Sequence, residues 1–187
     1  IMDEANKMNK MVRQLLTLTA LEFGNDTPSI AAFDVTELVH DLINSSGILI
    51  QQNAAKVSVD MPETLVVMGD EFKIEEVVTN YLTNAMNHLG GDHNIRIWSE
   101  TLDGVAKIHV YNNGTPIPEE DLPNLWTKFY KVDKARTRAY GGSGIGLSIV
   151  KAIMEAHHQQ YGVANHEDGV EFWFTLALAP EKPEEEE

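Results

Sequence analysis

The chain has 187 residues, no cysteine and a formal net charge of −15. A chain of this length can bury a hydrophobic core, and the lack of cysteine excludes disulfides and thiolate metal sites. No apolar run reaches the roughly 18 residues that suggest a transmembrane helix. Because the negative charge also opposes contact with a phosphate backbone, we expect neither a membrane span nor nonspecific nucleic-acid binding within these residues.

A helix is predicted over residues 1–22, because apolar residues recur there at heptad spacing. The heptad series are Ile1, Met8 and Leu15, then Ala5 and Val12, then Met11 and Leu18. This pattern is typical of a helical bundle or coiled-coil seam, although a helix that packs on its own domain would also fit. Gly24-Asn-Asp-Thr-Pro28 then breaks the chain like a hinge. We therefore expect a separate helix that needs partner helices and causes weak self-association.

Helices and strands are then predicted in turn. Asp34-Val-Thr-Glu37 resembles a capping box that opens a helix to about residue 53. Strands follow over 57–59 and 64–68 around the Pro62 turn, then a helix over 70–88, strands over 95–98 and 105–111, a helix over 144–157, and strands over 160–165 and 170–178. Residues 113–143 lack regular periodicity, which suggests a functional loop. The fold class is therefore α+β: a two-layer sandwich with a mixed, mostly antiparallel sheet and helices on one face.

The helix over 70–88 carries a polar stripe, because Asn80, Asn84 and His88 are spaced four residues apart. Amide oxygens are neutral, hard ligands that suit a Mg²⁺ ion shared with substrate phosphates. The same residues would also suit a plain polar surface, and the helix alone leaves both readings open. A carboxylate that could activate water is absent at position 80, and Glu76 is expected to face elsewhere. The pattern thus favours phosphoryl transfer to another acceptor over ATP hydrolysis.

Two glycine-bearing segments lie downstream. Asn112-Asn-Gly114-Thr-Pro-Ile-Pro118 ends a predicted strand, where Asn112 could accept a hydrogen bond from the exocyclic amine of adenine or mark an ordinary turn. Gly141-Gly-Ser-Gly144-Ile-Gly146 precedes a helix whose first N–H groups and dipole could hold phosphate. The second segment has neither the lysine of a P-loop nor the βαβ setting of a dinucleotide fold.

The segment between the glycines is basic, which suits polyphosphate neutralisation, although a solvated basic loop is the alternative. Its cations are Lys128, Lys131, Lys134, Arg136 and Arg138. Three aromatic residues within it, Trp126, Phe129 and Tyr130, are expected to anchor a movable lid.

In this order and at these spacings, the segments resemble the catalytic, ATP-binding domain of sensor histidine kinases, in the Bergerat-fold group that includes Hsp90, MutL and type II topoisomerases. The matching motifs are Asn80-x₃-Asn84-Ala85 for the asparagine motif, Asn112-x-Gly114 for the first glycine motif, Trp126-Thr-Lys-Phe129-Tyr130 for the phenylalanine motif and Gly142-x-Gly144-x-Gly146-Leu147 for the second glycine motif. The resemblance divides the chain into part of the second helix of a dimerisation and phosphotransfer hairpin (1–24), a linker (25–32), the catalytic domain (33–179) and a disordered acidic tail (180–187).

The resemblance implies that ATP and Mg²⁺ bind, with Asn84 coordinating the ion, Asn80 assisting, Asn112 facing the adenine amine and Lys131 reaching phosphate. The ATP-contacting residues that it implies are Asn80, Asn84, Asn87, His88, Asn112, Gly114, Ile117, Phe129, Tyr130, Lys131, Gly142, Ser143, Gly144, Ile145, Gly146 and Leu147. It further implies γ-phosphoryl transfer to a histidine of the hairpin and then to an aspartate of a response regulator, most similar to the OmpR type. The parent protein would be a homodimer, anchored in a bacterial membrane with this domain in the cytoplasm.

Three positions depart from the family pattern. Asn112 stands where aspartate is usual, Pro116 replaces a glycine, and Asn87 stands where many members carry Lys or Arg. These changes motivate the alternative of a degenerate, non-catalytic, nucleotide-responsive module. An ATPase or a serine kinase of the same fold is disfavoured by Asn80 and by the leading heptad helix, respectively.

The family's acceptor histidine lies on the first hairpin helix, whereas this chain opens at Ile1 in mid-pattern and is expected to be a fragment. Without that helix we expect no self-phosphorylation. The histidines that the chain does contain are each expected to be structural or exposed: His40, His88, His93, His109, His157, His158 and His166.

Overall fold

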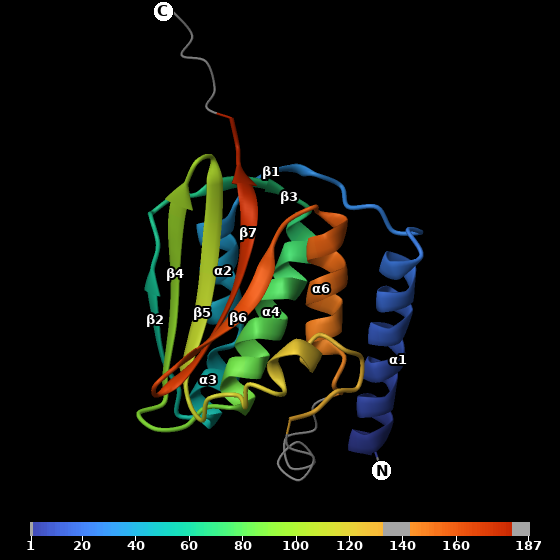
Figure 1. Cartoon of the computed structure of the whole chain (residues 1–187), viewed down its shortest axis with the longest axis vertical. Helices are drawn as coiled ribbons and strands as arrows, with labels where there is room; N and C mark the ends of the chain where they lie inside the picture. Colours follow the sequence, from blue (N-terminus) through green and yellow to red (C-terminus); the bar gives the residue numbers. More distant parts are fainter. Residues whose placement is uncertain (1, 133–142, 181–187) are drawn as a thin grey trace, which may run out of the picture.

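The computed structural model describes residues 2–132 and 143–180 (Figure 1). The expected basic residues Lys134, Arg136 and Arg138 and the tail from residue 181 onward lie outside the described residues. The elements are α1 (Met2–Glu22), β1 (Ala31–Asp34), α2 (Val35–Ser45), α3 (Gly47–Gln52), β2 (Lys56–Asp60), β3 (Val66–Gly69), α4 (Glu71–Asn87), β4 (Asn94–Leu102), β5 (Val105–Asn113), the 3₁₀ turn η1 (Leu122–Asn124), α6 (Gly146–Ala156), β6 (Tyr161–His166) and β7 (Gly169–Leu178).

The strands form one seven-stranded sheet in the order β1-β3-β7-β5-β4-β2, with β6 paired to β7. The β2–β4 pair is parallel, and the other pairs are antiparallel. Helices α2, α4 and α6 cover one face of the sheet, whereas none of the described helices covers the face turned toward the viewer in Figure 1. This arrangement confirms the predicted α+β sandwich with a mostly antiparallel sheet.

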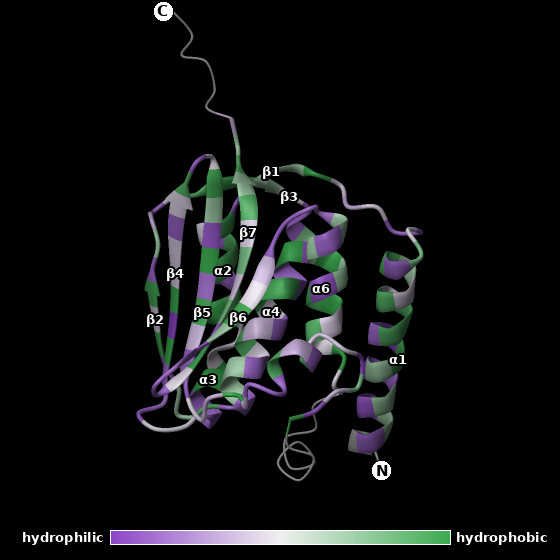
Figure 2. Ribbon diagram, in the orientation of Figure 1, coloured by the Kyte–Doolittle hydropathy of each residue, from purple (hydrophilic) through white to green (hydrophobic). Residues whose placement is uncertain are grey.

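Helix α4 fills the space between the sheet and the neighbouring helices. An apolar stripe along this helix is buried: Ile74, Val77, Val78, Tyr81, Leu82 and Ala85. Apolar and hydrophilic residues alternate along much of the sheet (Figure 2), but consecutive residues of the central strands β5 and β7 are buried. The Tyr81 ring packs against Phe172 and Phe174 of β7, with centroids 5.3 and 6.2 Å apart. The apolar contacts therefore fix α4 on the sheet and orient its polar stripe.

The single helix predicted over 34–53 is wrong, because the chain forms two helices, α2 and α3, that meet at Ser46. The predicted start is correct: the Asp34 side chain accepts hydrogen bonds from the backbone N–H groups of Thr36 and Glu37, at 2.9 and 3.4 Å. Gly47 follows Ser46, and glycine costs about 1 kcal/mol relative to alanine inside a helix. A new helix therefore begins there instead of the first one continuing.

The strands on either side of Pro62 exist, but they do not pair with each other. β2 lies at one edge beside β4, and β3 lies near the other edge between β1 and β7. Residues 31 and 32, which were expected in the linker, belong to β1. Strand periodicity shows which face of a strand is buried, but it does not specify the neighbouring strand.

Helix α1 packs on the rest of the chain, contrary to the expectation of a separate element. Leu18 is 1% exposed and Leu21 is also buried in the common core, and α1 runs alongside α6 (Figure 1). Met8, Val12 and Leu16 remain exposed on another face of α1. The heptad positions are thus divided between a face that packs on the domain and a face that stays open. No helix in the described ranges is long and apolar enough to span a bilayer.

Candidate functional site

Asn80 and Asn84 are half-buried on α4, one helical turn apart. The Asn80 Nδ2 group donates to the carbonyl of Glu76 at 2.9 Å, and this bond fixes the orientation of the amide. Its Oδ1 then faces the start of α6, because a Cβ added at Gly146 would lie only 2.6 Å from that oxygen. The asparagine motif and the second glycine motif, far apart in sequence, therefore meet at this point.

The turn before α6 brings the second glycine motif against the phenylalanine motif. Gly144 has φ +72°, and its carbonyl accepts a hydrogen bond of 2.8 Å from the Phe129 backbone N–H. A Cβ at Gly144 would lie 3.0 Å from the Phe129 Cα and 3.3 Å from the Lys131 Cε. Both the backbone angle and the close approach require glycine here. Gly142, the first glycine of the expected motif, lies outside the described residues.

Residues on either side of Gly144 hold this turn in place. The Ser143 hydroxyl accepts from the Ile145 N–H at 3.3 Å and donates to the Gln14 side chain of α1 at 3.1 Å. Ile145 is buried and Leu147 is half-buried in the core, so neither is a simple polar contact for a ligand. The first N–H groups of α6 follow directly, and an anion placed there would be stabilised by the helix dipole.

The end of β5 provides the second half of the site. Asn112 is 2% exposed, and its Nδ2 donates to the Asn113 carbonyl at 3.0 Å. The same carbonyl accepts the Gly90 N–H at 2.9 Å. With the amide nitrogen engaged, the Asn112 Oδ1 remains as an acceptor, which is the group that an exocyclic amine requires. Asparagine in place of the family's usual aspartate therefore keeps a hydrogen-bond acceptor at position 112.

Gly114 joins the first glycine motif to the end of the asparagine helix. A Cβ at Gly114 would lie 2.4 Å from the His88 carbonyl, so a larger residue would push the two segments apart. Asn87 is the last residue of α4, and the side chain of His88, which caps the helix, is exposed. Ile117 is held through its backbone, since its N–H donates to the Asn165 Oδ1 at 2.9 Å and its carbonyl accepts from the Asn165 Nδ2 at 2.7 Å. The sequence did not identify Asn165 as part of the site, because nothing except its place in a predicted strand distinguishes it from other asparagines.

The three aromatic residues expected to anchor the lid behave differently from one another. Trp126 is an anchor, because its ring packs edge-on against Tyr161 and Phe172, at centroid distances of 4.8 and 6.0 Å. Phe129 is 53% exposed with φ +63°, and the prediction that it is an anchor is wrong. Tyr130 donates to the Asp121 carboxylate, and this hydrogen bond raises the pKa of its hydroxyl.

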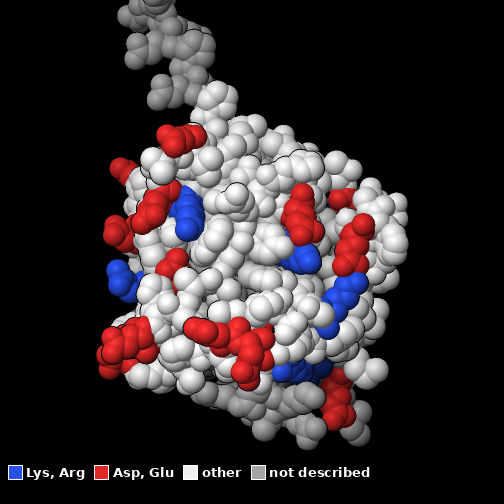
Figure 3. Space-filling model, viewed as in Figure 1, with Lys and Arg blue, Asp and Glu red and all other residues white. Residues whose placement is uncertain are grey.

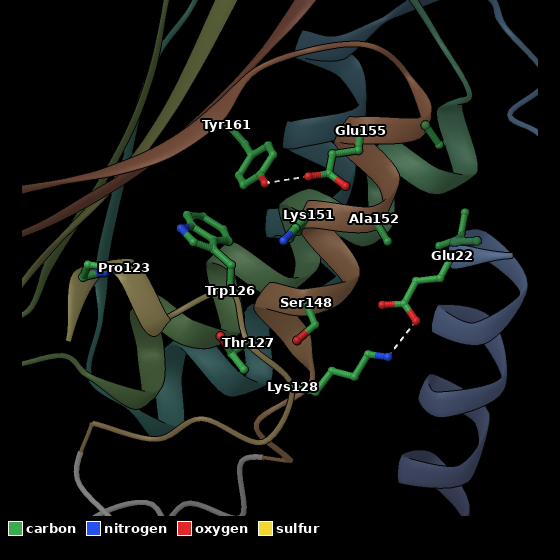
Figure 4. Close-up of a pocket in the computed structure, with 12 residues that line it drawn as sticks. Glu22, Pro123, Trp126, Thr127, Lys128, Ser148, Lys151, Ala152, Glu155 and Tyr161 are labelled. Atoms are coloured by element: carbon green, nitrogen blue, oxygen red, sulfur yellow. Dashed lines mark hydrogen bonds and ion pairs between the residues drawn. The ribbon is translucent and has the colours of Figure 1, made fainter. Parts of the chain in front are cut away.

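A separate cavity of about 550 Å³ lies on the opposite side of α6 from α4 (Figure 4). Trp126, Ser148, Lys151 and Tyr161 are among the residues that line it. Lys128 and Glu22 of α1 line it too, and they form an ion pair of 2.6 Å. The asparagines of α4 and β5 do not line this cavity. Trp126, Thr127 and Lys128 of the phenylalanine motif do line it, so the cavity adjoins that motif but not the asparagine or glycine motifs.

Two observations bear on how the site could hold a cation. Figure 3 shows acidic side chains outnumbering basic ones on the visible face. Within the described ranges, no group of three or more His, Asp or Glu side chains could hold a metal ion. A cation at the meeting point of the motifs would therefore depend on amide oxygens and on the oxygens of its own ligand. The Asn80 Oδ1, turned toward the glycine turn, fits that requirement.

The histidines are structural or exposed, as predicted. His109 and His157 are buried and hydrogen-bonded, and His166 bonds to Glu171 at 2.7 Å. His40, His88 and His158 are exposed, and His93 is half-buried. Glu76 is partly buried; burial raises its pKa, while Lys73 lowers it. Asp26, in the segment that follows α1, also raises the pKa of Glu76, so this carboxyl group lies near that segment.

Comparisons with known proteins show the family to which the chain is similar. Residues 69–180, more than half of the chain, match the family described as histidine kinase-, DNA gyrase B-, and HSP90-like ATPase. The sensor protein VanSB of Enterococcus faecalis is 31% identical over 171 residues, which cover 91% of this chain and 38% of VanSB. The catalytic domain of the histidine kinase ThkA superposes with a TM-score of 0.72 at 27% identity, covering 80% of this chain and 96% of that one. The structure of ThkA in complex with the response regulator protein TrrA superposes with a TM-score of 0.76 at 26% identity, covering 97% of this chain and 50% of that one.

Proposed function

Because the chain belongs to the histidine kinase-, DNA gyrase B-, and HSP90-like ATPase family, we propose that it is the Mg²⁺-ATP-binding catalytic part of a two-component sensor histidine kinase. The chain spans well under half the length of VanSB. The activity of the whole protein is therefore part of this proposal. The observation that carries it is the convergence of four distant segments, in which Gly146 meets Asn80 and Gly144 meets Phe129.

Each part of the site has a role that its chemistry supports. The Asn112 Oδ1 accepts the adenine amine, and the first N–H groups of α6 with Lys131 receive phosphate oxygens. The amide oxygens of Asn84 and Asn80 hold Mg²⁺, which neutralises charge on the phosphates when it is bound. Phosphoryl transfer requires little covalent chemistry from the protein, so that positioning and charge neutralisation account for most of the catalysis. The residues present are suited to that task.

The phosphoryl group would pass to a histidine on a hairpin helix and then to an aspartate of a response regulator. The ThkA–TrrA complex supports a response regulator as partner, and we propose one of the OmpR type. The exposed face of α1, with Met8, Val12 and Leu16, would contact the second protomer of a homodimer. We also propose that the domain is the cytoplasmic part of a membrane-anchored sensor, as the similarity to the sensor protein VanSB suggests.

A degenerate module without activity is the less favoured reading. Of the three departures, Asn112 keeps its acceptor oxygen, which weakens the main reason for that reading. Pro116 precedes Ile117, whose backbone is held by Asn165, so a stiff loop is compatible with the position it takes.

The test is calorimetric titration with a nonhydrolysable ATP analogue, with and without Mg²⁺. We expect Mg²⁺-dependent binding, and we expect Asn84→Ala to weaken it at least about tenfold because the ion loses an oxygen ligand. Asn44→Ala is the matched control, since Asn44 is exposed on α2. If the parent chain binds no nucleotide, the degenerate module becomes the better reading.

A further inference from the structure

We propose that a hydrogen-bonded cluster on the helix-free face of the sheet, formed by Tyr111, Asn113 and Asp168, positions the base-reading amide of Asn112 and sets the preference for 6-amino over 6-oxo purines. The inference rests on the proposed function, because it assumes that a purine nucleotide lies against Asn112. None of these three residues was expected to contact the nucleotide. They act across the strand, from the side opposite to the site.

The link between the two faces is the peptide bond from Asn113 to Gly114. Its carbonyl accepts from the Asn112 Nδ2 at 3.0 Å and from the Gly90 N–H at 2.9 Å. Its N–H donates to the carbonyl of Asp168, in the turn between β6 and β7, at 3.0 Å. The orientation of this peptide bond therefore decides where the Asn112 amide finds its acceptor.

The cluster holds that peptide bond from the other face. Because side chains alternate along a strand, Asn112 points toward the helices, while Tyr111 and Asn113 point away from them. The Asn113 Nδ2 donates to the Tyr111 hydroxyl at 2.9 Å and to the Asp168 Oδ2 at 3.2 Å, and its Oδ1 accepts from the Asn94 N–H at 3.1 Å. The Tyr111 hydroxyl in turn donates to the Asp168 Oδ1 at 2.7 Å. Asn113 and Tyr111 are buried, whereas Asp168 is exposed, and all three residues line a cavity of about 330 Å³.

The orientation of the Asn112 amide determines which base can be read. In the observed orientation, Oδ1 is the free group and can accept a hydrogen bond from a 6-amino group. A flipped amide would place Oδ1 against the Asn113 carbonyl, so that two acceptors would face each other about 3 Å apart. A 6-oxo purine presents another acceptor to Oδ1 and is rejected unless the amide flips. If the Asn113 carbonyl is held in place, the Asn112 amide keeps its observed orientation, and the site selects purines with a 6-amino group.

The experiment compares a nonhydrolysable ATP analogue with its inosine counterpart, which differs in the group at position 6 of the base. The parent chain should bind the ATP analogue at least about tenfold more tightly. Tyr111→Phe and Asp168→Asn should each reduce the ratio of the two affinities, ATP analogue over inosine analogue, about three- to tenfold. The reduction should come chiefly from tighter relative binding of the inosine analogue. Asn112→Ala should abolish the preference and serves as the reference for complete loss.

Tyr161→Phe is the matched control, since the Tyr161 hydroxyl also donates to a carboxylate, Glu155, at 3.2 Å, and its pKa, like that of Tyr111, is raised by burial to about 12. Tyr161→Phe should keep the parental ratio. If Tyr111→Phe and Asp168→Asn weaken both analogues by the same factor, the cluster gives only general support and the inference is overturned. If the parent binds neither analogue, the proposed function itself fails, which is a different result.

Discussion

At Gly146, a single hydrogen atom in place of a side chain lets α6 approach the asparagine helix. A methyl group there would lie 2.6 Å from the Asn80 Oδ1 and would have to displace the amide. We expect Gly146→Ala to lower Mg²⁺-dependent nucleotide affinity at least about tenfold, while stability changes by less than about 1 kcal/mol because alanine favours the helix. Calorimetry and urea unfolding measure the two effects separately.

Gly47→Ala is the control for that substitution, because nothing lies within 4 Å of the Cβ it would add at the start of α3. It should leave nucleotide affinity unchanged. Equal loss of affinity in both variants would show that the contact between Gly146 and Asn80 does not matter for the site.

His157 makes the stability of the domain depend on pH. Its Nε2 accepts from the Asp70 N–H at 3.0 Å and its Nδ1 bonds the Ile153 carbonyl at 2.8 Å, an arrangement that requires the neutral ring. Burial lowers the pKa of His157 below 6.5, although the Ile153 hydrogen bond and Asp70 oppose the shift. Because the unfolded chain then binds a proton more readily than the folded one, the stabilisation is complete above the unfolded pKa and is lost as the pH falls through 6.5 toward the folded pKa.

The measurement is urea unfolding between about pH 7.5 and pH 5.5. The parent chain should lose more stability over this range than His157→Asn. His158→Asn changes the adjacent, exposed histidine and should follow the parent. A parent and a His157 variant with the same pH slope would refute the assignment.

At the scale of elements, the question is how firmly α1 is attached. Leu18 is 1% exposed against the core, whereas Leu16, two residues earlier on the same helix, is 66% exposed. Leu18→Ala should weaken the packing of α1 on the domain by about 2–4 kcal/mol, and Leu16→Ala should weaken it by less than about 0.5 kcal/mol. Hydrogen exchange would show this as faster exchange in α1 for the first variant alone. Similar exchange in the two variants would mean that α1 does not dock as described.

At the scale of the whole molecule, the chain should bind nucleotide without phosphorylating itself. The expected acceptor is a histidine of a hairpin helix, whereas the seven histidines of this chain, from His40 to His166, all lie outside α1, in the catalytic domain. Incubation with labelled ATP should leave the chain unlabelled, and addition of a hairpin carrying an acceptor histidine should give a labelled hairpin. Stoichiometric label on a histidine of this chain would contradict this prediction.

The local patterns predicted much of this molecule. The start of α2 at Asp34, the helix α4 and the strands β4 and β5 were each readable from neighbouring residues, because periodicity and capping are local properties. The glycine segments also identified the candidate site, since a close approach of two segments requires glycine, and a glycine can be read directly from the sequence. Phe129 was predicted wrongly as an anchor, because the sequence records that a residue is apolar but not whether a surface is available to bury it.

By itself, the sequence determined most of the element types, the family resemblance and the residues that could meet a nucleotide. Only the tertiary structure decided that β2 and β3 lie at different parts of the sheet, that Leu18 docks α1 on the domain, and that the Asn113–Gly114 peptide bond is hydrogen-bonded to both the Asn112 amide and Asp168. The physical reason is the range of the interactions. A helix or a turn is stabilised by residues within a few positions of each other, whereas strand order, docking and the orientation of a buried amide depend on partners that are distant in sequence.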